Sequence, residues 1–178
     1  LMAKYNYPNN HIFHSWLVHF STMLFGSEPW AIRLPVMIAG VLTVGAIFVF
    51  APMLAGNAVA IIVAAIVANS SVLIEYSVNA RGYMLLNFFV IVLACLGFYL
   101  REKPNAAGWL VFSLLTALGF YTVPTMLFPF GGIVIWLGFI NLPPEKGRST
   151  RLNHLMMASG LGAFLAGVMY LPVVLVSG

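Results

Sequence analysis

The stretch IRLPVMIAGVLTVGAIFVF, residues 32–50, contains one charged side chain, that of Arg33. A helix needs about 20 mainly apolar residues to cross the roughly 30 Å hydrocarbon core of a bilayer, and this stretch meets that requirement. The whole chain of 178 residues is 62% hydrophobic and 7% charged, whereas soluble domains have about 45–50% apolar and 25% charged residues. The sequence therefore predicts an all-α, polytopic transmembrane helical bundle.

Other apolar runs suggest further spans at about residues 58–74, 83–100 and 154–176. Residues 108–140 are also apolar, but as one helix they would extend about 50 Å, which is more than a bilayer core requires. Pro124 interrupts this run, so we divide it into two short spans joined by a turn in YTVPT. We expect residues 31–178 to form a transmembrane region of about six spans.

Small residues recur at helical spacing in two of these predicted spans and form faces where another helix can approach closely. In the second span the expected face consists of Ala60, Ala64 and Ala68, and in the last span it consists of Ser159, Ala163 and Gly167.

Ahead of the first span, residues 10–25 have the pattern of an amphipathic helix that lies in the membrane surface. We expect Asn9 or Asn10 to cap its start and Gly26 to follow its end. Residues 1–30 would then form an outward-facing loop that carries this interfacial helix. One side of the helix would hold Ile12, Phe13, Trp16, Leu17, Phe20, Met23 and Leu24, and the other His11, His14, Ser15, His19, Ser21 and Thr22.

The histidines of this helix are open to three interpretations: a solvated polar face, one histidine that lines a site, or a pair that holds a metal ion. Three of them cannot share one ion, because His14 and His19 point about 140° apart on a helix. Cys95 is the sole cysteine, so a cysteine-based metal site has no support. We therefore predict neither a metal nor a cofactor. The basic residues are scattered through loops, which makes nucleic acid an improbable partner.

Basic residues also suggest an orientation. With two spans in 108–140, the loops at residues 101–107 and 141–153 fall on the same side of the membrane, and an excess of Lys and Arg marks the cytoplasmic side. Residues 1–30 and 75–82 would then face outward from a multi-pass protein of the cell (inner) membrane. The five basic residues in the two loops are Arg101, Lys103, Lys146, Arg148 and Arg151.

Three motifs resemble GT-C membrane glycosyltransferases of the protein O-mannosyltransferase and aminoarabinose transferase type. The first is NNHIFHSWLVHFSTMLFGSEPWAIRLPVMIAGVLTV, residues 9–44, which is similar to the end of that family's first extramembrane loop and the span that follows. The second, EYSVNARGYMLL at residues 75–86, resembles a tyrosine, arginine, tyrosine and leucine signature. The third, GFYTVPTMLF at residues 119–128, is similar to a YTH turn, with Val123 where the family often has histidine. Their order and spacing agree with the family.

The resemblance implies an integral-membrane enzyme that transfers a sugar from a polyprenyl-phosphate donor to an acceptor on the outer, periplasmic face. It also implies a general base from the first extramembrane loop, typically an aspartate. This sequence contains no aspartate, so we assign no catalytic residue and expect a fragment that lacks the N-terminal span and the acidic motif. Whether the chain is itself an enzyme stays open. The alternative is a non-catalytic membrane subunit that packs with other membrane subunits and binds lipid.

The sequence favours Arg81 as the group that holds the donor phosphate. Burying the charge of an arginine between two spans is energetically unfavourable unless the side chain meets an anion or a cavity. A guanidinium can bind phosphate through two hydrogen bonds. The alternatives are a snorkelling side chain or an ion pair with Glu75. Arg33 could equally anchor the start of its span. The full set that the resemblance implies for donor-phosphate binding is Arg81, Tyr76, Tyr83, His11, Asn10 and Arg33.

The predicted orientation can be tested by cysteine labelling. In a Cys95→Ala background, Asn105→Cys and Ser149→Cys should both react with a membrane-impermeant maleimide only from the cytoplasmic side, because both loops are basic. Labelling of the two positions from opposite sides would show that residues 108–140 cross the membrane once.

Overall fold

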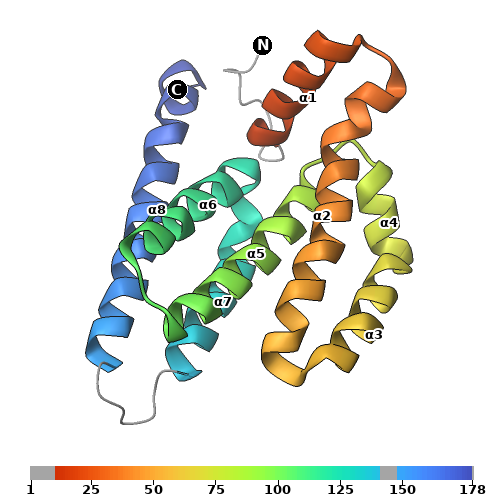
Figure 1. Ribbon diagram of the computed structural model, residues 1–178. Coiled ribbons are helices and arrows are strands. Elements are labelled where there is room, and N and C mark those ends of the chain that lie inside the picture. The colour runs from red at the N-terminus through yellow and green to blue at the C-terminus, as the bar shows by residue number, and fades with distance from the viewer. Residues whose placement is uncertain (1–10, 141–147, 178) are drawn as a thin grey trace. The chain divides into compact units, whose positions relative to one another are not determined.

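A computed structural model describes residues 11–140 and 148–177, which form helices and short connections with no strand (Figure 1). The predicted all-α architecture is confirmed. These residues group into two compact units, one from His11 to Val92 and one from Leu93 onward, and α5 contributes to both. The helices are α1 Ile12–Phe25, α2 Pro29–Ala55, α3 Asn57–Ala68, α4 Ser71–Val78, α5 Tyr83–Glu102, α6 Ala106–Thr122, α7 Leu127–Ile140 and α8 Arg148–Ser177, with a 3-10 turn η1 at Pro124–Met126.

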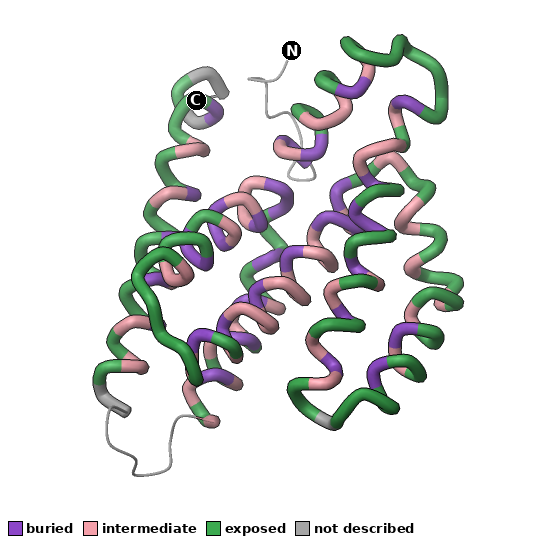
Figure 2. Tube along the Cα trace, viewed as in Figure 1, coloured by how far each residue is buried: buried purple, intermediate pink, exposed green. Residues whose placement is uncertain are grey.

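Three of the helices are long and apolar enough to cross a membrane, namely Pro29–Leu54, Tyr83–Glu102 and Thr150–Val173. The bent pair α3 and α4 brings the number to four if it counts as one span. Apolar side chains on the outside agree with lipid contact: Val41, Phe128 and Leu175 are 74%, 77% and 80% exposed (Figure 2). The chain is a multi-pass membrane protein, and the number of six spans stays a prediction.

In the first unit, α1 and α2 are consecutive helices joined by a tight turn at Gly26 (Figure 1). Gly26 has a φ of +80°, which a residue with a side chain rarely adopts, and its N–H donates to the Thr22 carbonyl. The Ser21 hydroxyl donates a 2.6 Å hydrogen bond to the Ala31 carbonyl and ties the two helices together. Gly26 therefore ends α1 as predicted. His11 occupies the N-cap position without a side-chain capping hydrogen bond, and the predicted caps Asn9 and Asn10 lie outside the described residues.

Two predicted span boundaries are wrong. Helix α2 extends beyond the predicted stretch 32–50, continues through Pro52 and ends at Gly56, whose φ of +86° breaks the helix. The second predicted span is divided into α3 and α4, which meet at a 58° bend near Asn69. The Asn69 side chain donates to the Ala65 carbonyl and so takes up a backbone acceptor at the end of α3.

The small-residue face predicted on α3 is largely confirmed. Ala60 and Ala64 are buried in the unit where α3 packs against α2, whereas Ala68 is exposed. Gly40 of α2 has a similar role toward α4, because a Cβ atom at this position would overlap the Ser77 hydroxyl. Close backbone approach therefore fixes the α3 and α4 segment beside α2.

In the second unit, the break in the long apolar run lies where the sequence predicts it. Helix α6 ends at Thr122, Val123 is extended, and η1 begins at Pro124. Helix α6 packs along α8, and the Ser113 hydroxyl donates to the Ala158 carbonyl across this contact.

The small-residue face of α8 that packs against α6 is shifted by one position along the sequence from the predicted face. Ala158, Gly162 and Ala166 are buried, whereas Ala163 and Gly167 are exposed. A Cβ atom at Gly162 would lie 2.7 Å from Thr116 Cβ and 2.9 Å from the Ser113 carbonyl oxygen. Two runs of small residues overlap in α8, and periodicity alone does not say which of them meets α6.

Replacement of Gly162 should therefore destabilise the protein. We expect Gly162→Ala to lower the free energy of unfolding by about 1–3 kcal/mol, because backbone atoms of α6 must move. Gly160→Ala is the matched control, since its Cβ atom would meet nothing within 4 Å and alanine favours helix. Thermal unfolding in detergent would measure both, and equal shifts for the two variants would contradict this packing.

Candidate functional site

Helix α1 turns its polar side toward the protein. His14 and Ser21 are buried, as is His11 at the N-cap, whereas Phe20 and Met23 on the opposite side are 51% and 66% exposed. The prediction of a solvated polar face is therefore wrong for these three polar residues, although Ser15 and His19 are exposed. An apolar outer face is the arrangement that contact with lipid favours. The interpretation in which one histidine lines a site stays a prediction.

Three of the predicted donor-site residues lie together in the first unit. The rings of His11 and Tyr83 meet edge to face with centroids 4.8 Å apart, and the Tyr76 ring lies 5.6 Å from that of Tyr83. The three side chains come from the N-cap of α1, from α4 and from the first residue of α5. Segments far apart in the sequence thus converge on one aromatic cluster, which consists of His11, Tyr76 and Tyr83.

His14 lies one turn further along α1 and is 5% exposed. Its Nε2 atom is buried and forms no hydrogen bond with the described residues. Burial, and to a lesser extent the positive charge of His11, lower the pKa of His14 from 6.5 to about 4. The imidazole is therefore neutral at physiological pH.

Arg81 is exposed in the short connection between α4 and α5, two residues before Tyr83. Its backbone N–H donates to the Asn79 carbonyl. Among the described residues, the one ion pair within 4.0 Å joins Arg101 and Glu102, so the alternative of a pair between Arg81 and Glu75 finds no support. The Arg81 side chain is thus exposed, two residues along the chain from the aromatic cluster.

The other two predicted residues are not brought into the cluster. Arg33 is exposed near the start of α2, and no described contact joins it to the cluster. Asn10 lies outside the described residues. Within those residues there is no group of three or more His, Cys, Asp or Glu side chains able to hold a metal ion.

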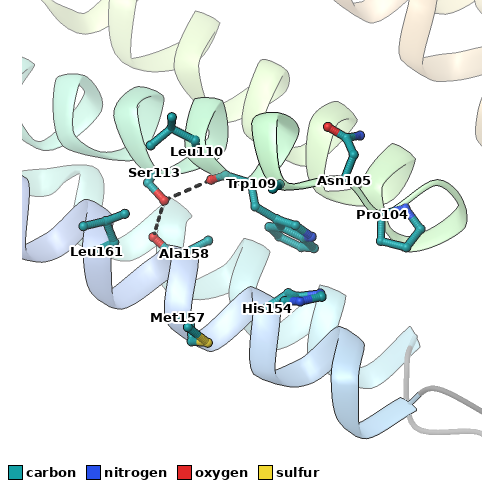
Figure 3. A pocket seen from close by; sticks show the side chains of 10 residues that line it. Pro104, Asn105, Trp109, Leu110, Ser113, His154, Met157, Ala158 and Leu161 are labelled. Carbon is teal, nitrogen blue, oxygen red and sulfur yellow. Dashed lines mark hydrogen bonds between the residues drawn. The ribbon is translucent and has the colours of Figure 1, made fainter.

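The structure also contains a polar site that the sequence did not indicate. Trp109 and His154, from α6 and α8 of the second unit, line a cavity of about 720 Å³ with their rings 6.2 Å apart (Figure 3). Sequence reasoning used His154 only as the start of a span. Its spacing from Met157 and Leu161 places all three on one helix face, which could have drawn attention to it.

The first unit contains several polar groups near the starts of α1 and α5. An exposed guanidinium, two phenols and the neutral imidazole of His14 can donate hydrogen bonds. A protein-family model described as dolichyl-phosphate-mannose-protein mannosyltransferase matches residues 9–174. The chain belongs to this family.

Membership in the mannosyltransferase family confirms the resemblance to GT-C membrane glycosyltransferases. Comparisons with curated proteins and with solved structures give no match. The family match covers all six residues predicted for donor-phosphate binding. The protein is thus a membrane glycosyltransferase of the mannosyltransferase type.

Burial of His14 predicts a dependence of stability on pH. Its pKa is lower in the folded chain, so between pH 6.5 and about 4 the unfolded chain binds a proton that the folded chain does not. Stability should be complete above pH 6.5 and fall by at most about 3 kcal/mol as the pH drops to 4. Melting temperatures against pH would measure this.

Two variants separate His14 from other titrating groups. His14→Gln should flatten the pH dependence between 6.5 and 4, whereas His19→Gln, at an exposed position of the same helix, should leave it unchanged. An unaltered pH dependence in His14→Gln would show that His14 is not buried as described.

Proposed function

We propose that the protein binds the phosphate of a polyprenyl-phosphate sugar through Arg81, beside the aromatic cluster, and that the sugar passes to an acceptor on the outer face of the cell (inner) membrane. The observation that carries this proposal is the convergence of His11, Tyr76 and Tyr83, two residues along the chain from Arg81, which is exposed and has no ion pair with Glu75. Family membership supports sugar transfer over the alternative of a non-catalytic subunit.

Arg81 suits the phosphate for electrostatic reasons. A guanidinium at a membrane interface loses part of its hydration, and an anion compensates for that loss more effectively than lipid does. A phosphate monoester or diester accepts two parallel hydrogen bonds from the planar guanidinium, which a lysine cannot provide. Its exposed side chain leaves the guanidinium accessible to a lipid headgroup.

The aromatic cluster would position Arg81 and contact the donor. Tyr83 follows Arg81 by two residues and packs against both His11 and Tyr76, so the start of α5 is held at a defined place. The phenol hydroxyls can donate hydrogen bonds to phosphate or sugar oxygens. Asn10 and Arg33 stay in the proposal as the resemblance implies them, with Arg33 as a second cation at headgroup depth.

The general base is not assigned. The sequence has no aspartate, and the described glutamates 28, 75 and 102 are all exposed. Glu75 immediately precedes Tyr76, but it forms no ion pair with Arg81. The proposal for this chain therefore concerns recognition of the donor phosphate.

Loss of Arg81 should weaken binding of the donor lipid. We expect Arg81→Ala to reduce affinity for polyprenyl phosphate roughly ten- to a hundredfold, as for loss of a charge-assisted hydrogen bond of about 1.5–3 kcal/mol. Arg81→Lys should have an intermediate effect, because it keeps the charge without the bidentate geometry. Binding would be measured with the purified chain in nanodiscs, with thermal stability followed in parallel.

Two further variants serve as controls for this experiment. Glu75→Gln should leave affinity and stability unchanged, since Glu75 and Arg81 are not paired. Arg101→Ala removes a cation at the other end of α5 and should not affect binding. Unchanged affinity in a well-folded Arg81→Ala protein would exclude Arg81 from the site, and equal losses in Arg81→Ala and Glu75→Gln would favour a structural ion pair.

A further inference from the structure

The cavity of about 720 Å³ in the second unit lies between α6 and α8. Its size is within the range of about 300–1,000 Å³ that is usual for small-molecule sites. Figure 3 shows the Trp109 and His154 rings beside each other in its lining, with Asn105 and Pro104 toward one end and Leu161 toward the other.

Two polar atoms of the lining are buried without a hydrogen bond to the described residues, Trp109 Nε1 and His154 Nδ1. In contrast, Ser113 donates to the Trp109 and Ala158 carbonyls at 3.0 Å, and Asn105 caps α6 by accepting from the Gly108 N–H. A buried polar atom without a partner destabilises the folded chain. The two rings line the cavity with nitrogen atoms that have no partner among the described residues, whereas Ser113 and Asn105 have partners within the chain.

Two basic residues lie close in the chain to residues at one end of the cavity. At the Asn105 end, Lys103 is exposed one residue before Pro104, and Arg151 precedes His154 by three residues, on the same face of α8. Beyond His154 the lining becomes apolar, with Leu110, Met157 and Leu161. A ligand that fits this gradient has an anionic head and a hydrocarbon tail.

We propose that this cavity binds an anionic phospholipid. The phosphate accepts a hydrogen bond from Trp109 Nε1–H and one from the His154 ring, near the positive charges of Lys103 and Arg151. One acyl chain lies along Leu110, Met157 and Leu161. Basic pockets between transmembrane helices on the cytoplasmic side recognise anionic lipid headgroups in this way, and the loop at residues 101–107 is predicted to be cytoplasmic.

An anionic phospholipid fits this place better than the donor lipid. The donor phosphate is proposed to bind at Arg81, in a segment predicted to face outward, and none of the cavity residues belongs to that site. The two proposals are therefore independent, and each is tested by its own variants.

Native mass spectrometry of the purified chain in detergent would test the proposal by titration with phosphatidylglycerol, phosphatidylcholine and polyprenyl phosphate. We expect phosphatidylglycerol to bind at least about tenfold more tightly than phosphatidylcholine, because only the former carries a net charge. Trp109→Phe and His154→Phe keep an aromatic ring and remove the nitrogen atoms, so each should weaken phosphatidylglycerol binding about five- to tenfold. Trp30→Phe, at an exposed tryptophan outside the cavity, should leave binding unchanged.

A second pair of variants blocks the cavity without removing a polar group. Met157 lines the cavity and Met156 does not, and both side chains are exposed, at 71% and 63%. Met157→Trp should abolish selective binding of phosphatidylglycerol, whereas Met156→Trp should leave it intact. This pair decides the question even if the ring variants fail to fold.

Three results would overturn the proposal. The first is equal affinity for phosphatidylglycerol and phosphatidylcholine. The second is an affinity for polyprenyl phosphate that exceeds the affinity for phosphatidylglycerol and is lost in Met157→Trp. The third is binding of phosphatidylglycerol that both Met157→Trp and Met156→Trp leave intact.

Discussion

Contact with hydrocarbon determines which side of each helix turns inward. Lipid provides no hydrogen bonds, so polar side chains in the membrane are stable only against protein or when bonded to the backbone of their own helix. The buried hydroxyls of Thr43 and Thr116 follow this rule, because they donate to carbonyls one turn earlier at 2.7 and 2.8 Å. The buried polar side of α1 follows it as well. That inward side brings His11 to Tyr83.

The sequence predicts the parts of the fold that depend on composition. The apolar runs indicate where helices lie, and Pro124 indicates where α6 ends. The sequence does not show which way an amphipathic helix faces, because His14 and Ser21 would suit either water or a protein interior. The bend at Asn69 was also missed, since one side-chain hydrogen bond to Ala65 competes with a continuous helix there.

Helix packing in the second unit also could not be predicted from the sequence alone. Two small-residue faces run along α8, and the one that meets α6 contains Gly162. Which of the two is used depends on the shape of α6 around Thr116, which lies 46 residues earlier in the chain. Periodicity within one helix does not contain that information.

The candidate site was predictable to a similar degree. The order of motifs indicated His11, Tyr76 and Tyr83, and the structure places these three rings in contact. The motifs gave no indication of Trp109 and His154, because that pair depends on two helices meeting side by side. Local patterns therefore identify residues that act together within a motif, whereas sites between distant helices require the fold.

The orientation of α1 is the central claim, because the aromatic cluster exists only if the polar side of α1 faces the protein. Electron paramagnetic resonance of nitroxide labels at Phe20→Cys and Val18→Cys, in a Cys95→Ala background, would test it most directly. Phe20 is exposed and Val18 is half-buried. The account predicts that lipid-dissolved oxygen reaches the label at position 20, and that the label at position 18 is immobilised and shielded from both oxygen and a water-soluble nickel chelate. A label at position 18 that the nickel chelate reaches, with position 20 shielded, would contradict it.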